Sequence, residues 1–147
     1  MSDDERVVEF RLVNMETISK KLSSGESISG REKLRVMQTI WRTWRFHLSV
    51  REFSLVSYVI ERTILESKDH FVAPVREMID GSEDFASIGI SRSTYFRICN
   101  RLEAIGILFR VPLREGTLIA LNLLWNAEWL DHQSSLSSSF NELDEEE

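Results

Sequence analysis

The sequence predicts an α+β fold that is mainly helical, and two observations indicate this. Apolar residues recur at helical spacing over residues 92–105, as they do on the buried side of an amphipathic helix. Two short runs rich in β-forming residues follow, at 107–112 and 117–125, and residues 113–116 join them as a hairpin turn. Further helical patterns precede this region. We therefore expect several helices followed by a small antiparallel sheet.

The helix expected over residues 92–105 has clear signals at both ends. Ser91 is a favoured N-cap, since its hydroxyl can accept a backbone N–H of the first turn. Gly106 ends the helix, where a left-handed conformation costs glycine little. The apolar side carries Tyr95, Ile98, Cys99, Leu102 and Ile105. The opposite side carries Arg92, Ser93, Phe96, Arg97, Asn100 and Arg101. The pattern predicts a helix with a buried back and a basic front.

Three further elements are expected before this helix. Ser49 and Glu52 form a capping-box pattern, which predicts a helix from there to about residue 67 with its apolar stripe at Phe53, Val56, Ile60 and Ile64. Residues 70–72 are a candidate short strand, and Pro74 suits the first turn of a helix that ends near Asp80. Residues 81–89 form a connection longer than the usual tight turn between two such helices.

The ends of the chain differ in composition from the middle. Residues 1–30 predict a flexible or partly ordered segment, with a linker at 23–30. Residues 31–47 predict a helical extension with Leu34, Met37, Ile40, Trp41 and Trp44 on one side. These two tryptophans, interleaved with arginines, are expected to pack onto the domain or onto a second subunit rather than to stack on bases or rest on a membrane. Residues 126–147 are Ser-rich and then acidic, and predict a disordered tail.

The net charge of −6 argues against DNA binding until its distribution is considered. Three acids lie at the N-terminus and five in the last six residues, and without these eight the body of the chain is about +2. Residues 91–114 contain five arginines and a single acid, Glu103. The region around the expected basic helix is therefore positive.

Composition and motifs exclude several other classes of protein. The chain has neither an apolar run of membrane-spanning length nor a signal-peptide pattern, and its single cysteine rules out an internal disulfide. We therefore expect a cytoplasmic protein. The three histidines are isolated from metal-ligand partners, and the glycines form no phosphate-binding loop. We expect no catalytic site, metal, cofactor or small-molecule ligand.

A helix with an apolar back, a basic front and an attached hairpin is typical of the winged helix-turn-helix, which reads DNA. We assign this domain to residues 48–125. In this interpretation Arg92, Ser93, Arg97 and Arg101, with Asn100 on the same face, meet bases or phosphates in the major groove. Arg110 and Arg114 belong to the wing, beside the minor groove or the backbone.

Over residues 48–125, about half the chain, the sequence resembles the N-terminal domains of phage replication proteins of the O type and rhizobial repressors of conjugal plasmid transfer. The matching motifs are Leu-Ser-Val-Arg-Glu-Phe at 48–53, Ile-Glu-Arg-Thr at 60–63, Gly-Ile-Ser-Arg-Ser-Thr-Tyr-Phe-Arg at 89–97 and Arg-Leu-Glu-Ala-Ile-Gly-Ile-Leu at 101–108. The resemblance implies DNA contacts from Arg92, Ser93, Thr94, Arg97 and Arg101.

The expected function is therefore that of a sequence-specific transcriptional regulator, a repressor in the first instance, which binds double-stranded DNA. A two-fold operator would require a homodimer, for which the helix bearing Trp41 and Trp44 is the candidate interface. Two alternatives stay open. One is a phage or plasmid replication initiator, and the other is a winged-helix module that binds protein instead of DNA. The basic face of the helix over 92–105 favours DNA.

Overall fold

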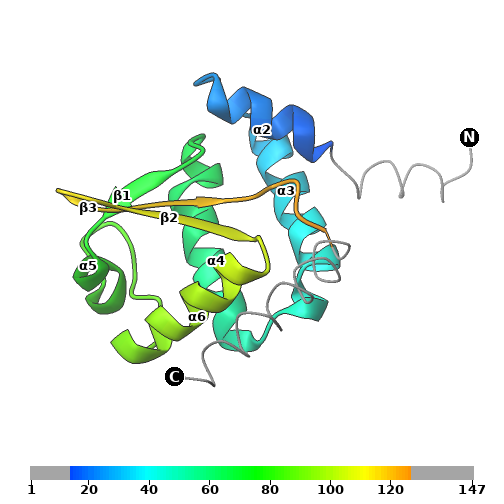
Figure 1. Ribbon diagram of the computed structural model, residues 1–147. Helices are drawn as coiled ribbons and strands as arrows, with labels where there is room; N and C mark the ends of the chain where they lie inside the picture. Colours follow the sequence, from blue (N-terminus) through cyan, green and yellow to red (C-terminus); the bar gives the residue numbers. More distant parts are fainter. Residues whose placement is uncertain (1–13, 127–147) are drawn as a thin grey trace, which may run out of the picture.

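The structure, a computed structural model, describes residues 14–126 and confirms an α+β fold that is mainly helical. Its elements in order are α2 (Met15–Ser23), α3 (Gly30–Thr43), the 3₁₀ turn η1 (Arg45–His47), α4 (Val50–Arg62), the 3₁₀ turn η2 (Ile64–Glu66), β1 (Phe71–Ala73), α5 (Val75–Asp80), α6 (Arg92–Ala104), β2 (Leu108–Leu113) and β3 (Gly116–Leu121). The strands form a sheet that crosses α4 and α6, and α3 lies at the end of the sheet opposite the β2–β3 hairpin turn (Figure 1).

The sheet is antiparallel, with β3 between β1 and β2. Ile119 of β3 is paired with Phe71 on one side and with Arg110 on the other. Gly116 opens β3 with a φ of 149°, and a Cβ there would lie 2.7 Å from the backbone carbon of Ala73. Glycine at this position therefore lets the hairpin close against the end of β1.

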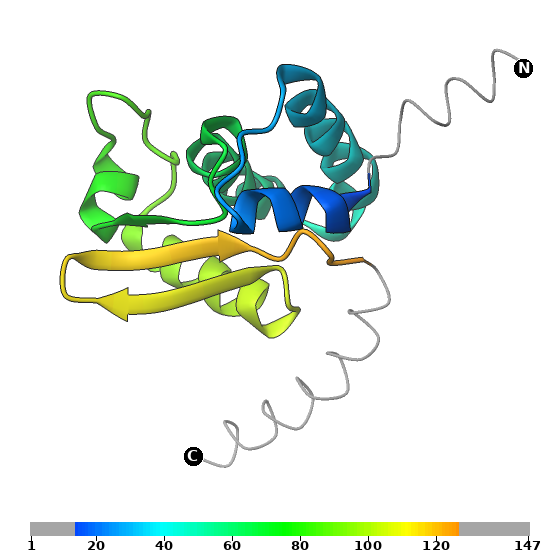
Figure 2. The ribbon, with the colours of Figure 1, turned by 90° about the horizontal axis from the view of Figure 1, so that it is seen from above.

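The second strand of the hairpin is shorter than the sequence predicts, since β3 ends at Leu121 rather than at residue 125. Asn122 turns the chain there. Its side-chain amide donates to the Gly106 carbonyl oxygen at 3.0 Å, and its side-chain oxygen accepts the Leu124 N–H at 3.1 Å. These bonds turn the chain so that the Trp125 ring contacts Trp44, next to α3, and the Ile105 carbonyl oxygen, next to α6. Figure 2 shows the chain leaving the sheet after β3 toward the N-terminal helices.

The helix starts follow local side-chain chemistry. The capping box predicted at Ser49 and Glu52 is present, and Ser91 caps α6 by accepting the Thr94 N–H at 3.2 Å. A second capping box, between Ser29 and Glu32, begins α3 at Gly30. The linker expected at residues 23–30 is therefore shorter, and α2 occupies residues 15–23 of the segment expected to be flexible or partly ordered. The acidic tail from residue 127 onward lies outside the described residues.

One apolar core joins all the helices to the sheet. Leu55, Val56 and Val59 of α4 pack in it with Leu102 of α6 and Ile119 of β3, and all five side chains are fully buried. The same cluster includes residues of α2 and α3. The N-terminal helices are therefore part of the described domain's core rather than an appendage to it.

The apolar side expected for α3 is partly wrong. Val36, Thr39 and Ile40 are its buried residues, whereas Leu34 and Trp41 are exposed. Trp44 is 1% exposed and lies edge-to-face on Trp125 with ring centroids 5.7 Å apart. Trp44 thus packs onto its own chain, which is one of the two arrangements expected for the tryptophans. A homodimer through this helix stays a prediction, with Trp41 as its exposed tryptophan.

We predict that Trp44→Ala lowers the free energy of unfolding by about 3–5 kcal/mol, because it leaves a cavity next to Trp125. Trp41→Ala, the matched change on the same helix at a side chain that is 42% exposed, should cost less than about 1 kcal/mol. Urea unfolding followed by circular dichroism measures both. Equal costs for the two variants would contradict this assignment of the core.

Candidate nucleic-acid interface

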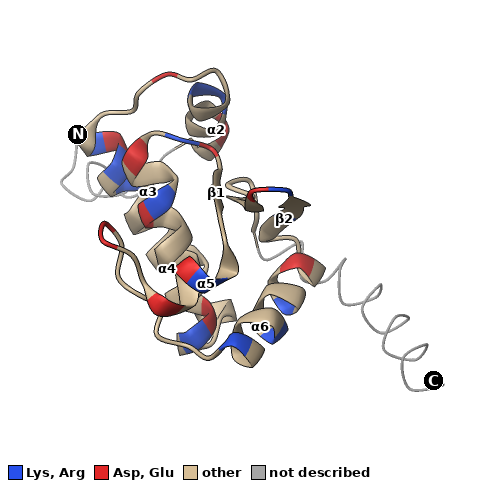
Figure 3. Ribbon diagram, turned by 90° about the vertical axis from the view of Figure 1, so that its left-hand side faces the viewer, with Lys and Arg blue, Asp and Glu red and all other residues tan. Residues whose placement is uncertain are grey.

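Helix α6 presents its polar face to solvent because its apolar face is held by the core. Tyr95, Cys99 and Leu102 are fully buried, and α6 contacts both α4 and β2. The exposed positions include Arg92, Ser93, Phe96, Arg97, Asn100 and Arg101. Figure 3 shows the basic positions spaced along α6, with an acidic position near its C-terminal end. The division into buried and exposed sides is the one predicted from the sequence.

The first turn of α6 is rich in hydroxyl groups. Besides capping the backbone, the Ser91 hydroxyl donates to Thr94 Oγ1 at 2.9 Å and lies 3.3 Å from Ser93 Oγ. The Arg92 guanidinium lies over the Phe96 ring, 5.5 Å from its centroid. This turn contains no acidic residue. The dipole at a helix N-terminus favours an anion. The hydroxyl groups and the Arg92 guanidinium of this turn can donate hydrogen bonds to the same anion, so the site suits a phosphate.

Arg97 and Arg101 lie one turn apart, but within residues 14–126 only Arg101 has a carboxylate partner. Its Nη1 is 2.7 Å from Oε2 of Glu52, on α4. Glu52 has an 8% exposed side chain, and its Oε1 accepts the Ser49 N–H at 2.6 Å. The Arg101 side chain is 46% exposed, so it keeps donors toward solvent while part of its charge is offset.

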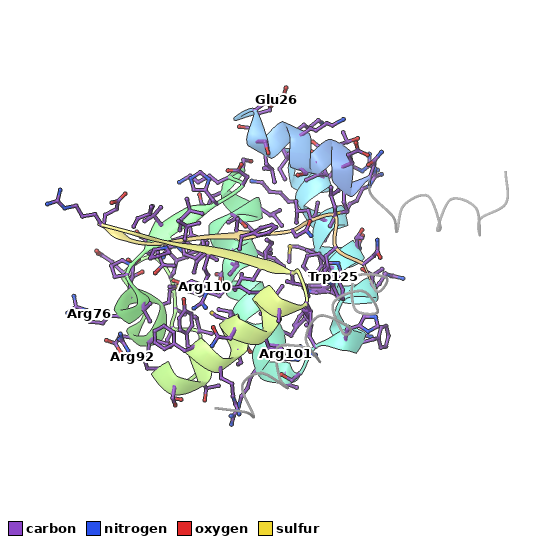
Figure 4. All side chains as sticks on the ribbon, in the orientation of Figure 1. Glu26, Arg76, Arg92, Arg101, Arg110 and Trp125 are labelled. Carbon is purple, nitrogen blue, oxygen red and sulfur yellow. The ribbon has the colours of Figure 1, made fainter. Side chains whose placement is uncertain are left out.

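Arg110, which the sequence interpretation assigned to the DNA-contacting wing, does not lie at the hairpin tip. It lies between the sheet and α6, with a 17% exposed side chain (Figure 4). It pairs with Glu103 and donates to Oδ1 of Asn100 at 2.9 Å. Burial is the largest single influence and opposes its charge, but the hydrogen bond to Glu103 and the charges of Cys99, Glu103 and Tyr95 together outweigh burial, so the pKa of Arg110 is raised. Arg110 therefore ties β2 to α6, and it engages the side-chain oxygen of Asn100.

The hairpin tip carries Arg114 and Glu115 in a two-residue turn, both exposed. Along β2, alternate residues point to the side of the sheet away from α6. These are Phe109, Val111 and Leu113, and all three are exposed. Among the wing residues expected to meet DNA, only Arg114 is thus an exposed cation, and it stands beside an apolar surface.

Two further arginines lie near α6 that sequence reasoning did not select. Arg51, in the first turn of α4, lines a groove together with Arg97 and Arg101. Arg76 of α5 projects at the same end of the molecule as Arg92 (Figure 4). Both are exposed and lie in the first turn of their helices. In the sequence, the only indication of a role was that both arginines occupy expected exposed positions on the two helices before α6. Their closeness to α6 follows from the tertiary structure alone.

The long connection from α5 to α6 is held in place by Arg62, at the end of α4. Its guanidinium lies between the rings of Phe71 and Phe85, 4.6 and 4.5 Å from their centroids, and pairs with Glu77 of α5 at 3.1 Å. Ile88 N–H also donates to the carbonyl oxygen of Met78 at 3.1 Å. The connection is therefore packed against α4 and α5, which fixes where α6 begins.

Cys99, the one cysteine of the sequence, is buried on the apolar side of α6. Burial raises the pKa of the Cys99 thiol to about 11 and also raises the pKa of Tyr95. A thiol with so high a pKa is a weak nucleophile at neutral pH. Within residues 14–126, no group of three or more His, Cys, Asp or Glu side chains could hold a metal ion. No helix in the same range is long and apolar enough to cross a membrane.

Comparison with known proteins adds no relative. No family model matches the chain, and neither the curated proteins nor the solved structures contain a match. The resemblance of residues 48–125 to replication and repressor domains therefore stays an expectation from the motifs.

We predict that Cys99 does not react with an aromatic disulfide reagent at mildly alkaline pH in the native protein, because its thiol is buried and protonated. It should react once denaturant unfolds the chain. The change in absorbance of the released thiolate measures this. Rapid reaction in the native state would contradict the buried placement.

We predict that Glu52→Gln lowers the free energy of unfolding by about 2 kcal/mol, because the amide would turn a donor toward the Arg101 guanidinium. The capping contact to Ser49 can be kept by the amide oxygen. Glu61→Gln, on the exposed side of the same helix, is the matched control and should be nearly neutral. Denaturant unfolding measures both, and a neutral Glu52→Gln variant would show that the ion pair does not hold α6.

Proposed function

We propose that the chain is a winged helix-turn-helix protein that binds double-stranded DNA through α6 and acts as a sequence-specific transcriptional regulator. Its element order, α4–β1–α5–α6–β2–β3 with β3 central, fits that fold. In such proteins the helix corresponding to α6 enters the major groove. We propose that it acts as a repressor, by occupying a promoter.

The observation that carries the proposal is the exposed face of α6. Arg92 and Arg97 stand on it with the hydroxyls of the first turn, and Glu103, the one acid of α6, is turned to Arg110. Arginine is the side chain that most often reads a guanine edge, and helix N-termini with hydroxyl groups bind phosphate. A face without free carboxylates avoids repelling the DNA backbone.

The individual roles differ from residue to residue. Arg92, Ser93 and Arg97 are the proposed direct contacts, and Thr94 supports the first turn. Arg101 is proposed as a phosphate contact oriented by Glu52, since a phosphate can share its remaining donors. Arg51 and Arg76 are proposed as additional phosphate contacts on either side of α6. Asn100 and Arg110 are proposed to brace the helix, and Arg114 to meet the backbone from the hairpin tip.

A protein-interaction module is the second candidate, and one observation favours it. A wing that follows the phosphate backbone is expected to be polar or basic, whereas Phe109, Val111 and Leu113 make one side of β2 apolar and exposed. This surface suits a protein partner better than DNA. The two candidates use different faces, so substitutions on α6 and on β2 distinguish them.

We predict that the double variant Arg92→Ala/Arg97→Ala binds a mixed-sequence duplex several-fold more weakly. The slope of log affinity against log salt should fall by about two, because each arginine removed leaves one phosphate without its cation. If Arg97 reads a base edge instead, the slope falls by about one and binding to the selected sequence weakens by about 1–3 kcal/mol. Fluorescence anisotropy at several salt concentrations measures both quantities.

The control for this experiment is Arg42→Ala, an exposed arginine of α3, a helix that supplies none of the proposed DNA contacts. It should leave affinity and salt slope unchanged. Weakening by Arg42→Ala as strong as that of the α6 variant would mean that charge anywhere on the surface suffices. No weakening by the α6 variant would contradict the proposal.

A further inference from the structure

A basic groove of about 580 Å³ opens beside α6. Its walls come from η1, the first turn of α4 and the middle of α6. The cationic lining consists of Arg51, Arg97 and Arg101, with His47 at the edge formed by η1, and the apolar floor includes Leu48 and Ile98. Glu52 is the one acid of the lining, and its carboxylate pairs with Arg101 and accepts the Ser49 N–H. The groove therefore presents positive charge over an apolar floor.

The chain carries a segment of complementary charge. Residues 127–147 contain seven Asp and Glu and neither Lys nor Arg, and five of these acids fall in the last six residues. Residues 14–126 contain 16 Lys and Arg against 13 Asp and Glu. The C-terminal segment also includes Trp129, Leu136 and Phe140, which are apolar enough to meet the floor of the groove.

The chain enters this segment next to the groove. Trp125 is 3% exposed and donates from its indole N–H to the Ile105 carbonyl oxygen at 2.8 Å. Its ring also lies edge-to-face on His47, with centroids 5.8 Å apart. Since His47 lines the groove, the anchor of the C-terminal segment touches the groove's edge. Figure 4 places Trp125 on the side of the molecule where the described chain ends.

The C-terminal segment is long enough, and attached close enough, to reach the groove. The residues between Asn126 and Glu142 can span up to about 50 Å, far more than the width of a side-chain groove. A segment anchored at the edge of its own site has an effective concentration of about a millimolar, so even a weak ionic contact is populated. A separate acidic protein would have to exceed that concentration to compete.

We infer that the acidic C-terminal segment, residues 127–147, docks in the groove between η1, α4 and α6 of its own chain. The carboxylates of Glu142 and residues 144–147 lie against the guanidinium groups of Arg51, Arg97 and Arg101. Docking itself does not depend on DNA. Its consequence, competition with phosphates for Arg97 and Arg101, rests on the proposed function.

The test places a nitroxide spin label at Ser139→Cys in the full chain, since the buried Cys99 thiol resists labelling. At low salt, about 0.02 M, the amide NMR signals of residues 46–52 and 97–101 should decrease to less than half their intensity. At about 0.5 M salt, where charges are screened within a few ångströms, the signals should recover. Undiminished groove signals at low salt would overturn the inference.

Two variants test the charges directly. Replacing the five terminal acids (Glu142→Gln, Asp144→Asn, Glu145→Gln, Glu146→Gln, Glu147→Gln) should restore the groove signals at low salt, and Arg51→Gln should restore them in part. Arg42→Gln, which removes an equal charge from α3, should leave the broadening intact. Broadening that persists with all five acids replaced would refute an ionic contact.

A mixing experiment separates this chain from a second copy. Isotope-labelled protein without the spin label is mixed with spin-labelled protein that carries no isotope. Docking within one chain predicts undiminished signals in the mixture. Broadening of the groove signals there would assign the site to the C-terminal segment of another molecule and overturn the inference.

DNA titration keeps this inference distinguishable from the proposed function. The variant without the five acids should bind a mixed-sequence duplex about fivefold more tightly at low salt, because the groove arginines no longer have an internal competitor. Groove broadening without DNA binding by either chain would support docking and remove the proposed function. DNA binding without groove broadening would remove docking alone.

Discussion

Glu52 is the residue on which the geometry of the candidate interface depends most. One of its carboxylate oxygens accepts the Ser49 N–H and so begins α4, while the other holds Arg101 of α6 at 2.7 Å. A carboxylate this buried must have charged or hydrogen-bonding partners, because an unpaired one would cost several kcal/mol. The start of α4 and the middle of α6 therefore cannot separate without leaving a buried charge. This pairing sets the walls of the groove and the direction in which α6 presents its arginines.

The same kind of pairing determines which charges of the interface are available. Of the five arginines between residues 91 and 114, Arg110 is committed to Glu103 and Arg101 shares its charge with Glu52. Arg92, Arg97 and Arg114 remain without a carboxylate partner within residues 14–126. Arg51 and Arg76 add charge from neighbouring helices. The positive field is thus smaller along α6 than the sequence alone suggests, but wider across the surface.

Local features of the fold could be predicted from the sequence, because each depends on residues a few positions apart. The capping box of Ser49 and Glu52, the N-cap at Ser91 and the two faces of α6 are of this kind. The capping box of Ser29 and Glu32 follows the same pattern and could have been found. Contacts between distant residues could not be predicted, since Glu52 and Arg101, Arg110 and Asn100, or Trp44 and Trp125 are related only by packing. These contacts decide which arginines face solvent and why Trp44 is unavailable to a partner.

Selection of bound sequences from random duplex DNA at physiological salt tests the central claim most directly, since affinity for DNA depends steeply on salt. The protein used should be the full chain, with its fold verified by circular dichroism. We predict enrichment of a defined motif whose preference is relaxed at one position by Arg97→Ala. A folded protein that enriches no sequence would contradict DNA recognition by α6 and would direct attention to the apolar face of β2.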